Sequence, residues 1–414
     1  MMTIRYLKAL IGLSAVSVAL ACGTDTTSPD QPPSGEDKVF ADAARTAWAF
    51  VQNNTQASTG LAKAHYTFQY VTTWDIASEI AATYAAHELG IIDDANYDGR
   101  IRKILGTLSG LPLVDGAAFN RFYDSETGKM VNRDFTASTT GFGWSTTDIG
   151  RLLTWLKILA VNQPQYADQA AAIVNRLNYS RLISGGTLQG TDTDASGTRY
   201  GYAETGLGYE QYAAAGFALW SHRATASLDP GAHVQNVDIG GVQVSVDNRG
   251  VARLTSEPYI MLGMESGWYS PILEDQAHRI VDAQQARYQQ TGIVTIVTED
   301  AMPDPPYYFY YYSLYHSGRT FVVEGPPMGT YVDKPRWISS KAAFAWRVLF
   351  PTDYTLTALN AVQSAAIPDQ GWGAGVYEDT KQPTGDASLN TAGMILEAVL
   401  YRKLGHSFLS LPIL

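Results

Sequence analysis

The sequence predicts a mainly α-helical protein, an α/α toroid with long loops and a small β-hairpin. Apolar residues recur at helical spacing in about ten segments, and these segments form neighbouring pairs with short turns between them. Strand patterns are few, and long loops rich in glycine and aromatic residues separate the helical pairs. In an α/α toroid, outer helices cover a ring of inner helices, and the loops at one end form the pocket. A helical array of another shape fits the same pattern.

The first predicted helix begins near Phe40, because Phe40, Ala44 and Val51 fall on one helical face. The second helix is unusually rich in alanine and isoleucine, and Gly90 is a typical C-cap for it. Pro164 is expected to begin a helix rather than to interrupt one. The predicted helices span residues 40–51, 74–89, 96–108, 146–161, 165–178, 209–222, 272–290, 339–349, 354–365 and 388–404.

Strand signals are confined to two short segments. Alternating apolar residues at 237–246 surround Gly240 and Gly241, which predicts a β-hairpin. Residues 293–297 are a short β-branched run typical of a strand. Four long stretches are expected as loops, residues 128–143, 184–208, 302–337 and 369–387. Because no fixed-period repeat and no Pro/Ser-rich linker divides residues 39–414, they are expected to form a single domain.

The composition excludes several classes of function. The chain has 414 residues, of which 45% are hydrophobic, and a net charge of −11, so it is globular and acidic. An acidic chain without a Lys/Arg run is not expected to bind nucleic acid or acidic polymers such as uronates. The single cysteine excludes a disulfide framework and a cysteine-based zinc site. A neutral substrate or a protein partner remains.

The N-terminal residues predict an export signal and a lipid anchor. Arg5 and Lys8 precede an apolar run that ends at Cys22, and this arrangement resembles a bacterial lipobox. Residues 1–21 are therefore expected as a signal peptide, and residues 22–38 as a lipidated cysteine followed by a flexible tether. Ordinary cleavage after Ala21 is the alternative. The lipoprotein prediction places the chain in the cell envelope, anchored to the outer membrane in a Gram-negative cell and facing the periplasm or the exterior.

Tyrosine and tryptophan are abundant, with 25 Tyr and 9 Trp in the chain. Their rings present an apolar face and a polar atom, which suits stacking on sugars and hydrogen bonding to sugar hydroxyls. Aromatic residues next to glycine and acids in loops therefore predict carbohydrate binding. The expected substrate-binding aromatics are Trp74, Trp144, Tyr209, Trp268 and Trp372. A dense aromatic run at residues 307–315 fits a core role and a ligand role equally well.

Acidic residues beside Trp, Tyr or Gly, several of them at predicted helix starts, are the second chemical signal. Burial raises the pKa of a carboxyl, as a general acid working near neutral pH requires. Acids in a first helical turn are also stabilised by the helix dipole, without any catalytic role. Several such acids together favour a site, and the candidates are Asp75, Asp148, Glu204, Glu210, Glu257, Glu265 and Glu378.

No metal site and no cofactor is predicted. The seven histidines form no H-E-x-x-H pattern and no paired spacing. Asp192 and Asp194 resemble the start of a calcium loop, but Glu204 lies one residue too late to close it, so an Asp/Gly-rich turn is expected. Glycine motifs for phosphate or dinucleotide binding do not occur in the strand–helix context that they require.

Ordered motifs along the chain are similar to a known bacterial family. They run from Trp74-Asp75-Ile76, through Gly143-Trp144-Ser145 and Leu207-Gly208-Tyr209-Glu210, to Asn390-Thr391. Together they resemble the domain-of-unknown-function family three-one-three-one over residues 41–405. That family is distantly similar to the glycoamylase-like (α/α)6 enzymes, which include endo-β-1,2-glucanases. The resemblance implies an (α/α)6 toroid and places Glu210 in a Gly-aromatic-x-Glu motif that opens an inner helix. It matches Asp148 to an acid on an earlier inner helix, and β-1,2-glucan as a substrate enters only through it.

The resulting hypothesis is a secreted glycoside hydrolase that acts as a monomer on a neutral polysaccharide or oligosaccharide. Glu210 is expected as the general acid and Asp148 or Asp75 as the base that activates water, which favours inversion. The first alternative is a non-catalytic glycan-binding surface lipoprotein, whose binding does not depend on Glu210. A polysaccharide lyase is disfavoured by the low Lys/Arg content, and a protein-interaction scaffold by the many loop aromatics.

Overall fold

The computed structural model describes residues 35–249, 253–303, 309–325 and 330–409. Helices are the dominant elements of these residues, which confirms the predicted mainly α class. None of the helices in the described ranges is long and apolar enough to cross a membrane. Cys22 and the expected signal peptide lie outside the described residues.

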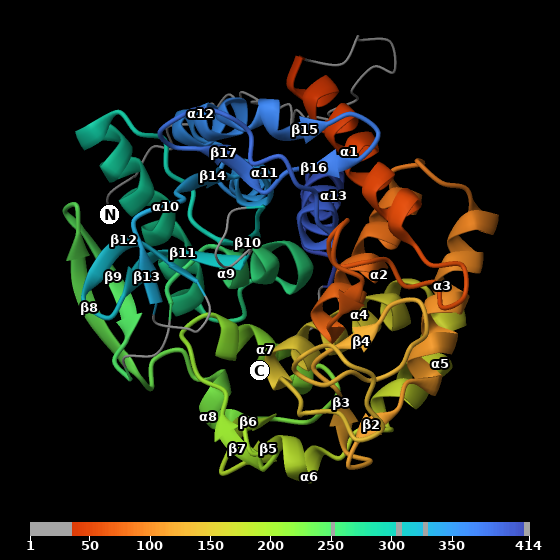
Figure 1. Cartoon of the computed structure of the whole chain (residues 1–414). Coiled ribbons are helices and arrows are strands. Elements are labelled where there is room, and N and C mark those ends of the chain that lie inside the picture. The colour runs from red at the N-terminus through yellow and green to blue at the C-terminus, as the bar shows by residue number, and fades with distance from the viewer. Residues whose placement is uncertain (1–34, 250–252, 304–308, 326–329, 410–414) are drawn as a thin grey trace, which may run out of the picture.

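Six of the described helices form a closed ring, in which each helix contacts the next and the last contacts the first (Figure 1). In ring order these inner helices are α2 (Thr73–Glu88), α4 (Thr146–Asn162), α7 (Tyr209–Ala218), α9 (Glu257–Met261), α11 (Ser340–Leu349) and α13 (Leu389–Leu404). A π-helical turn, Leu262–Ser266, extends α9 toward the other end of the ring. The ring order is also the order along the chain, so the ring closes where α13 meets α2.

A second set of helices packs against the outside of the ring. Inner and outer helices alternate along the chain, and each outer helix contacts an inner helix that neighbours it in sequence or across the ring closure. The outer helices are α1 (Gly35–Asn54), α3 (Asp94–Gly110), α5 (Ala167–Val174), α8 (Thr225–Leu228), α10 (Pro271–Thr291) and α12 (Asp353–Ala361). The short helix α6 (Tyr179–Leu182) and two 3₁₀ turns, Pro164–Tyr166 and Gln363–Ala365, lie in connections.

The inner helices are buried on nearly every side, because they contact both their ring neighbours and the outer layer. In α2, every residue from Thr73 to Ala86 except Asp75 is buried. Small residues let the inner backbones approach closely: a Cβ atom at Gly216 would lie 2.1 Å from the carbonyl oxygen of Gly150. Only glycine tolerates this crossing of α4 and α7.

Strands form small antiparallel sheets in the connections between helices. The largest sheet of the described residues is a four-stranded meander between α10 and α11, made of β10 (Glu299–Ala301), β11 (Phe309–His316), β12 (Arg319–Gly325) and β13 (Thr330–Val332). A three-stranded sheet before α7 contains β5 (Ile183–Ser184), β6 (Thr187–Thr193) and β7 (Arg199–Ala203).

The remaining sheets are two-stranded pairs. They are β1 (Tyr70–Val71) with β4 (Tyr123–Asp124), β2 (Leu113–Val114) with β3 (Ala118–Phe119), β8 (Val234–Ile239) with β9 (Val242–Asp247), β14 (Trp337–Ser339) with β17 (Gly375–Tyr377), and β15 (Ala366–Ile367) with β16 (Gly371–Trp372). The hairpin predicted around Gly240 and Gly241 is confirmed as β8–β9. Both glycines have positive φ, as the two-residue turn requires.

Other strand predictions were wrong. Residues 293–297 are not a strand, although residues 295–297 are buried, and the pairing begins only at Glu299. All four stretches expected as loops contain paired strands or bridges, and β11 runs through the aromatic segment at 307–315. In β11, Tyr310 and Tyr312 are fully buried, so these two rings have a core role, while residues 307 and 308 lie outside the described ranges.

The start of the folded body also differs from the prediction. Helix α1 begins at Gly35, so the last residues of the expected tether, 35–38, are helical. Glu36 accepts hydrogen bonds from Arg347 at 2.9 Å and from Arg402 at 2.9 Å. These two arginines lie at the C-terminal ends of α11 and α13, and Glu36 therefore belongs to the folded body.

Candidate active site

The first turns of the six inner helices meet at one end of the ring, which we call the mouth. Each of these turns carries a polar side chain: Asp75 on α2, Asp148 on α4, Tyr209 on α7, Glu257 on α9, Lys341 on α11 and Asn390 on α13. The N-terminal end of a helix carries a partial positive charge, so the mouth favours acidic side chains and electron-rich ligand atoms.

Asp75 is held by a capping box at the start of α2. Its Oδ2 accepts hydrogen bonds from the backbone N–H and the hydroxyl of Thr72, both at 2.9 Å. Burial raises the pKa of Asp75, while the Thr72 hydrogen bonds and the Arg151 guanidinium oppose that increase. Two donors and a nearby cation therefore offset part of the cost of burying the ionised form, and the pKa of Asp75 stays above its usual value.

Asp148 occupies the equivalent place on α4, where Ser145 caps the helix by accepting from the Asp148 N–H at 3.2 Å. Burial raises the pKa of Asp148 to about 7, with the Glu204 and Asp75 carboxylates adding to the increase and Arg121 opposing it. Asp148 and Asp75 lie in the first turns of two helices that contact each other, α4 and α2. At neutral pH a substantial fraction of Asp148 is protonated.

Glu204 reaches the same place from the connection between β7 and α7. It accepts hydrogen bonds from the N–H of Thr146 at 3.2 Å and from the hydroxyl of Tyr202 at 3.3 Å. Burial raises the pKa of Glu204, and Arg121 again opposes the increase. Glu204 thus caps the first turn of α4 and puts a negative charge beside Asp148.

Two aromatic rings lie next to these acids. Trp74 and Tyr209 have ring centroids 6.0 Å apart, and the Arg151 guanidinium lies 4.8 Å from the Trp74 ring. The indole N–H of Trp74 is buried and has no hydrogen-bond partner in the described part of the chain, whereas the hydroxyl of Tyr209 interacts with the Glu299 carboxyl. The mouth therefore combines acids, ring faces and a buried indole N–H.

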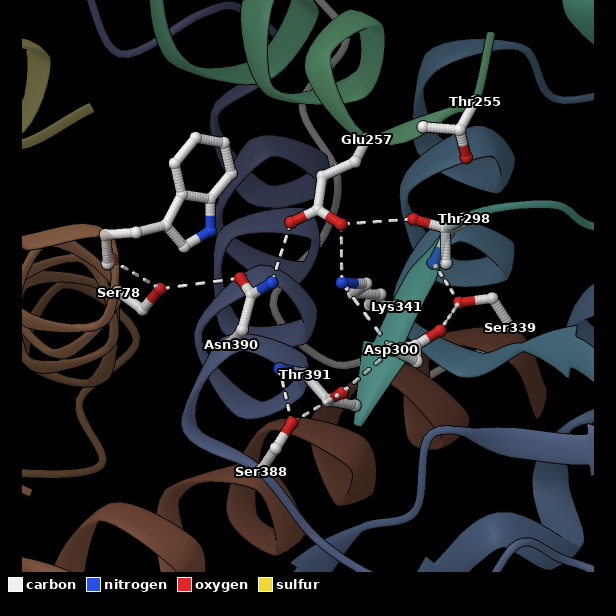
Figure 2. Close-up of polar contacts among 12 residues, drawn as sticks. Ser78, Thr255, Glu257, Thr298, Asp300, Ser339, Lys341, Ser388, Asn390 and Thr391 are labelled. Atoms are coloured by element: carbon white, nitrogen blue, oxygen red, sulfur yellow. Dashed lines mark hydrogen bonds and ion pairs between the residues drawn. The ribbon is translucent and has the colours of Figure 1, made fainter. Parts of the chain in front are cut away.

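On the other side of the mouth, Glu257 links three inner helices (Figure 2). Its Oε2 accepts from Lys341 Nζ at 2.6 Å, and its Oε1 accepts from Asn390 Nδ2 at 2.7 Å. Thr298 donates to the same carboxylate at 3.1 Å, and Lys341 also lies 3.5 Å from Asp300. Since every oxygen of Glu257 is engaged and the side chain is fully buried, this cluster fixes the helices rather than presenting Glu257 to a ligand.

Glu265 lies deeper in the ring than the mouth. It accepts from Trp155 Nε1 at 2.9 Å and from the Tyr212 hydroxyl at 2.5 Å, and it is fully buried. Arg151 joins this layer by donating to Glu397 at 3.0 Å and to Asn390 Oδ1 at 2.9 Å. The structure therefore gives Glu265 a place in the core, not on a ligand-facing surface.

Glu210, the expected general acid, points away from the mouth. Its Oε1 accepts from Ser227 Oγ at 2.7 Å and its Oε2 from Arg249 Nη2 at 2.7 Å. Ser227 belongs to the outer helix α8, and Arg249 follows strand β9. Tyr209 and Tyr212, by contrast, face Trp74 across the ring. The structure does not bring Glu210 together with Asp148 or Asp75.

Four further predicted binding residues lie in structural positions. Trp144 is buried and donates to the carbonyl of Gln189, and Trp372 is buried and donates to the carbonyl of Ala43. Trp268 follows the π-helical turn at the far end of α9 and stacks on Phe350 at 5.6 Å. Glu378 accepts from both terminal nitrogens of Arg287 at 2.8 Å.

Sequence reasoning missed Glu299, Lys341 and Arg121. Burial and the Glu257 carboxylate raise the pKa of Glu299 to about 8, while the charge of Lys341 and hydrogen bonds with Tyr311 and Tyr209 oppose the increase. Glu299 is the first residue of β10, and no element is predicted from the sequence for residues 299–301. The described residues contain no group of three His, Cys, Asp or Glu side chains that could hold a metal ion.

Solved structures share this fold at low sequence identity. A candidate glucoamylase from Bacteroides fragilis NCTC 9343 has a TM-score of 0.66 and 15% identity, over 91% of this chain and 94% of that chain. An endo-β-1,2-glucanase from Chitinophaga pinensis, solved with sophorotriose and glucose, has a TM-score of 0.65 and 15% identity, over 91% and 96%. An endo-β-1,2-glucanase mutant from Talaromyces funiculosus, solved with β-1,2-glucan, has a TM-score of 0.57 and 12% identity, over 88% and 84%.

At the level of sequence, no curated protein matches the chain. The family model for proteins of unknown function named DUF3131 matches residues 42–405. This match spans nearly the whole body, from α1 to the end of α13. The chain therefore belongs to the DUF3131 family.

Proposed function

We propose that this protein is a glycoside hydrolase that cleaves a neutral glucan at the mouth, with β-1,2-glucan as the first substrate to test. One observation carries the proposal: Asp148 and Glu204 lie at the first turn of α4, and Asp75 lies in the first turn of the neighbouring helix α2. Trp74, directly before Asp75, places its ring against that of Tyr209. The closed ring with its outer layer is, in this proposal, an (α/α)6 toroid. Paired carboxyls beside aromatic faces are what hydrolysis of a sugar polymer requires.

Asp148 is the proton donor in the proposed mechanism. With a pKa raised to about 7, its carboxyl stays partly protonated near neutral pH and can give its proton to the glycosidic oxygen as the C–O bond breaks. Asp75 is the proposed base: burial raises its pKa, and the hydrogen bonds from Thr72 and the charge of Arg151 offset part of that increase. It takes a proton from the water that attacks the anomeric carbon, which inverts the configuration.

The charge of the mouth supports a neutral substrate. Three neighbouring carboxyls on the α2–α4 side repel a uronate polymer, and a net charge of −11 adds to that repulsion. Two of the similar solved structures are endo-β-1,2-glucanases captured with β-1,2-linked glucose ligands or glucan. Their names support a glucan as the first substrate class to test.

The experiment compares the protein with its Asp148→Asn variant on a panel of neutral glucans, with chromatography of the products. Removing a general acid typically slows turnover by about 10²–10⁴-fold. Asp168→Asn is the matched control, since Asp168 is also an acid in a first helical turn but is exposed on outer helix α5. Proton NMR of the first products reads the anomeric configuration.

A non-catalytic glycan-binding lipoprotein is the alternative function. It uses the same aromatic rings and needs no proton donor. Binding of a glucan by the wild-type protein, with no turnover on any member of the panel, establishes this alternative and removes the hydrolase proposal. Equal turnover by wild type and Asp148→Asn contradicts only the role of Asp148.

We also propose that Cys22 is lipidated and anchors the protein to the outer membrane of a Gram-negative cell. The apolar run before Cys22 and the Thr/Ser/Pro-rich residues after it support this proposal. Cys22→Ser is expected to release the protein from membranes or to block its processing. Mature protein found soluble in the periplasm with an unmodified N-terminus contradicts the anchor.

A further inference from the structure

Four half-buried aromatic side chains from two segments of the chain, residues 68–70 and 122–135, form a cluster that we call the aromatic rim: Phe68, Tyr70, Phe122 and Phe135. Phe135 is at its centre. Its ring stacks on Tyr70 at 4.7 Å and 22°, and it meets Phe68 edge-on at 5.0 Å and Phe122 at 5.4 Å. All four rings keep part of their surface open to solvent.

The aromatic rim is continuous with the proposed catalytic carboxyls through two short stretches of chain. Tyr70 lies in β1, directly before Thr72, whose N–H and hydroxyl hold Asp75. Phe122 follows Arg121, whose charge opposes the increase in the pKa of Asp148 and Glu204 that burial causes. Since β1 pairs with β4, these two stretches lie side by side at the edge of the mouth.

The backbone of Phe135 is unusual for a bulky residue. Its φ is +63°, in the left-handed region, within a turn closed by a hydrogen bond from its N–H to the carbonyl of Asn132 at 2.9 Å. Such a conformation costs on the order of 1–3 kcal/mol and tends to occur at ligand-binding sites. The strained turn holds the Phe135 ring partly exposed at the surface. A half-buried ring gains less packing energy than a buried one, so packing offsets only part of the backbone strain.

We propose that the aromatic rim binds the glucan chain beyond the cleavage point, by stacking the apolar faces of its sugar rings on Tyr70 and Phe135. This inference rests on the proposed function and extends it to polymer recognition. The rim presents uncharged rings, and the polar side chains beside it, Gln69 and Asp124, hydrogen-bond each other at 2.8 Å. A neutral polymer fits such a surface, whereas an acidic polymer is repelled by Asp124.

The test uses Tyr70→Leu and Phe135→Leu, which keep apolar bulk but remove the flat ring. The matched control is Tyr200→Leu, since Tyr200 is an exposed tyrosine on β7 outside the rim. Long β-1,2-glucan and a short β-1,2-linked oligosaccharide are compared as substrates. We expect each rim variant to raise KM for the polymer by about twofold to tenfold more than for the oligosaccharide, in line with one lost aromatic contact.

Retention of the same variants in a gel containing the long glucan supplies a readout independent of turnover. Weaker retention of the rim variants than of Tyr200→Leu supports the rim, even when the wild-type protein hydrolyses nothing and the proposed function fails. Unchanged retention, or equal changes in KM for polymer and oligosaccharide, overturns the rim. Thermal unfolding of each variant shows whether it is folded, and an unfolded Phe135→Leu leaves Tyr70→Leu to decide.

Discussion

Lys341 and Glu257 form an ion pair on the α9–α11 side of the mouth, with Nζ 2.6 Å from Oε2 and side-chain exposures of 1% and 0%. The pair joins the first turns of α11 and α9, and Asn390 extends it to α13. Three of the six inner helices therefore depend on one buried cation and its partners. Removing one partner of a buried ion pair destabilises a protein strongly, because the other charge stays buried without a partner. Replacing both partners with uncharged residues costs much less.

Lys341→Met is expected to lower the free energy of unfolding by about 3–5 kcal/mol, because it leaves Glu257 buried without its cation. Chemical denaturation followed by circular dichroism measures this loss. The double variant Glu257→Gln with Lys341→Met removes both charges and is expected to recover part of the stability. A single variant as stable as the wild type shows that the pair does not hold the ring.

Glu204→Gln is expected to move the pH dependence of activity. The Glu204 carboxylate raises the pKa of Asp148, and a proton donor fails when pH rises above its pKa. Removing that charge lowers the pKa of Asp148, so the fall of kcat/KM on the alkaline side shifts to lower pH. The measurement is kcat/KM on the active glucan from about pH 5 to about 9. If the fall of kcat/KM on the alkaline side does not move, Asp148 is not the proton donor.

Glu210→Gln is expected to keep turnover while losing stability. The substitution leaves the carboxamide beside Ser227 but removes the ion pair with Arg249. Glu210 is buried and Arg249 is partly exposed, and losing such a hydrogen-bonded charge pair costs about 1–3 kcal/mol. Steady-state kinetics and thermal unfolding on one preparation separate the two effects. A large fall in kcat with an unchanged melting temperature restores Glu210 as the proton donor.

Gly216→Ala is expected to destabilise the ring. The added Cβ would lie 2.1 Å from the Gly150 carbonyl oxygen, and this forces α4 and α7 apart. Gly106→Ala is the control, because Gly106 lies in outer helix α3 with no heavy atom within 4 Å of the added Cβ. The control is expected to gain about 0.5–1 kcal/mol from helix propensity. Equal melting temperatures for the two variants contradict the close crossing.

Glu79→Gln is expected to increase stability at alkaline pH. Burial raises the pKa of Glu79 from 4.5 to about 8. Because the folded-state pKa lies above the unfolded value, the contribution of Glu79 to stability is complete below about pH 4.5 and is lost as pH rises toward 8. The glutamine variant lacks this loss, so its advantage over wild type grows between pH 5 and about 8. Denaturation midpoints that differ by the same amount at every pH contradict the shift.

The sequence alone determined where most of the helices lie and which acids open them. Helix starts are local events: Thr72 caps α2, Ser145 caps α4 and Ser388 caps α13, each through hydrogen bonds within its own first turn. The hairpin at Gly240 and Gly241 is equally local, since positive φ at two adjacent glycines selects the turn. Helix α9 escaped prediction because it has only five residues, too few to repeat an amphipathic period.

Only the tertiary structure decided which acids face the mouth. Tyr209 and Glu210 are adjacent in the chain, yet one helical step of about 100° turns Tyr209 into the ring and Glu210 toward Arg249. Glu257 and Asp148 both open inner helices, but Lys341, brought from α11, forms an ion pair with Glu257. Burial, together with the Glu204 and Asp75 carboxylates, raises the pKa of Asp148 and keeps it partly protonated. The charge state of a buried carboxyl depends on the groups that the fold places around it, and these groups lie far away in the sequence.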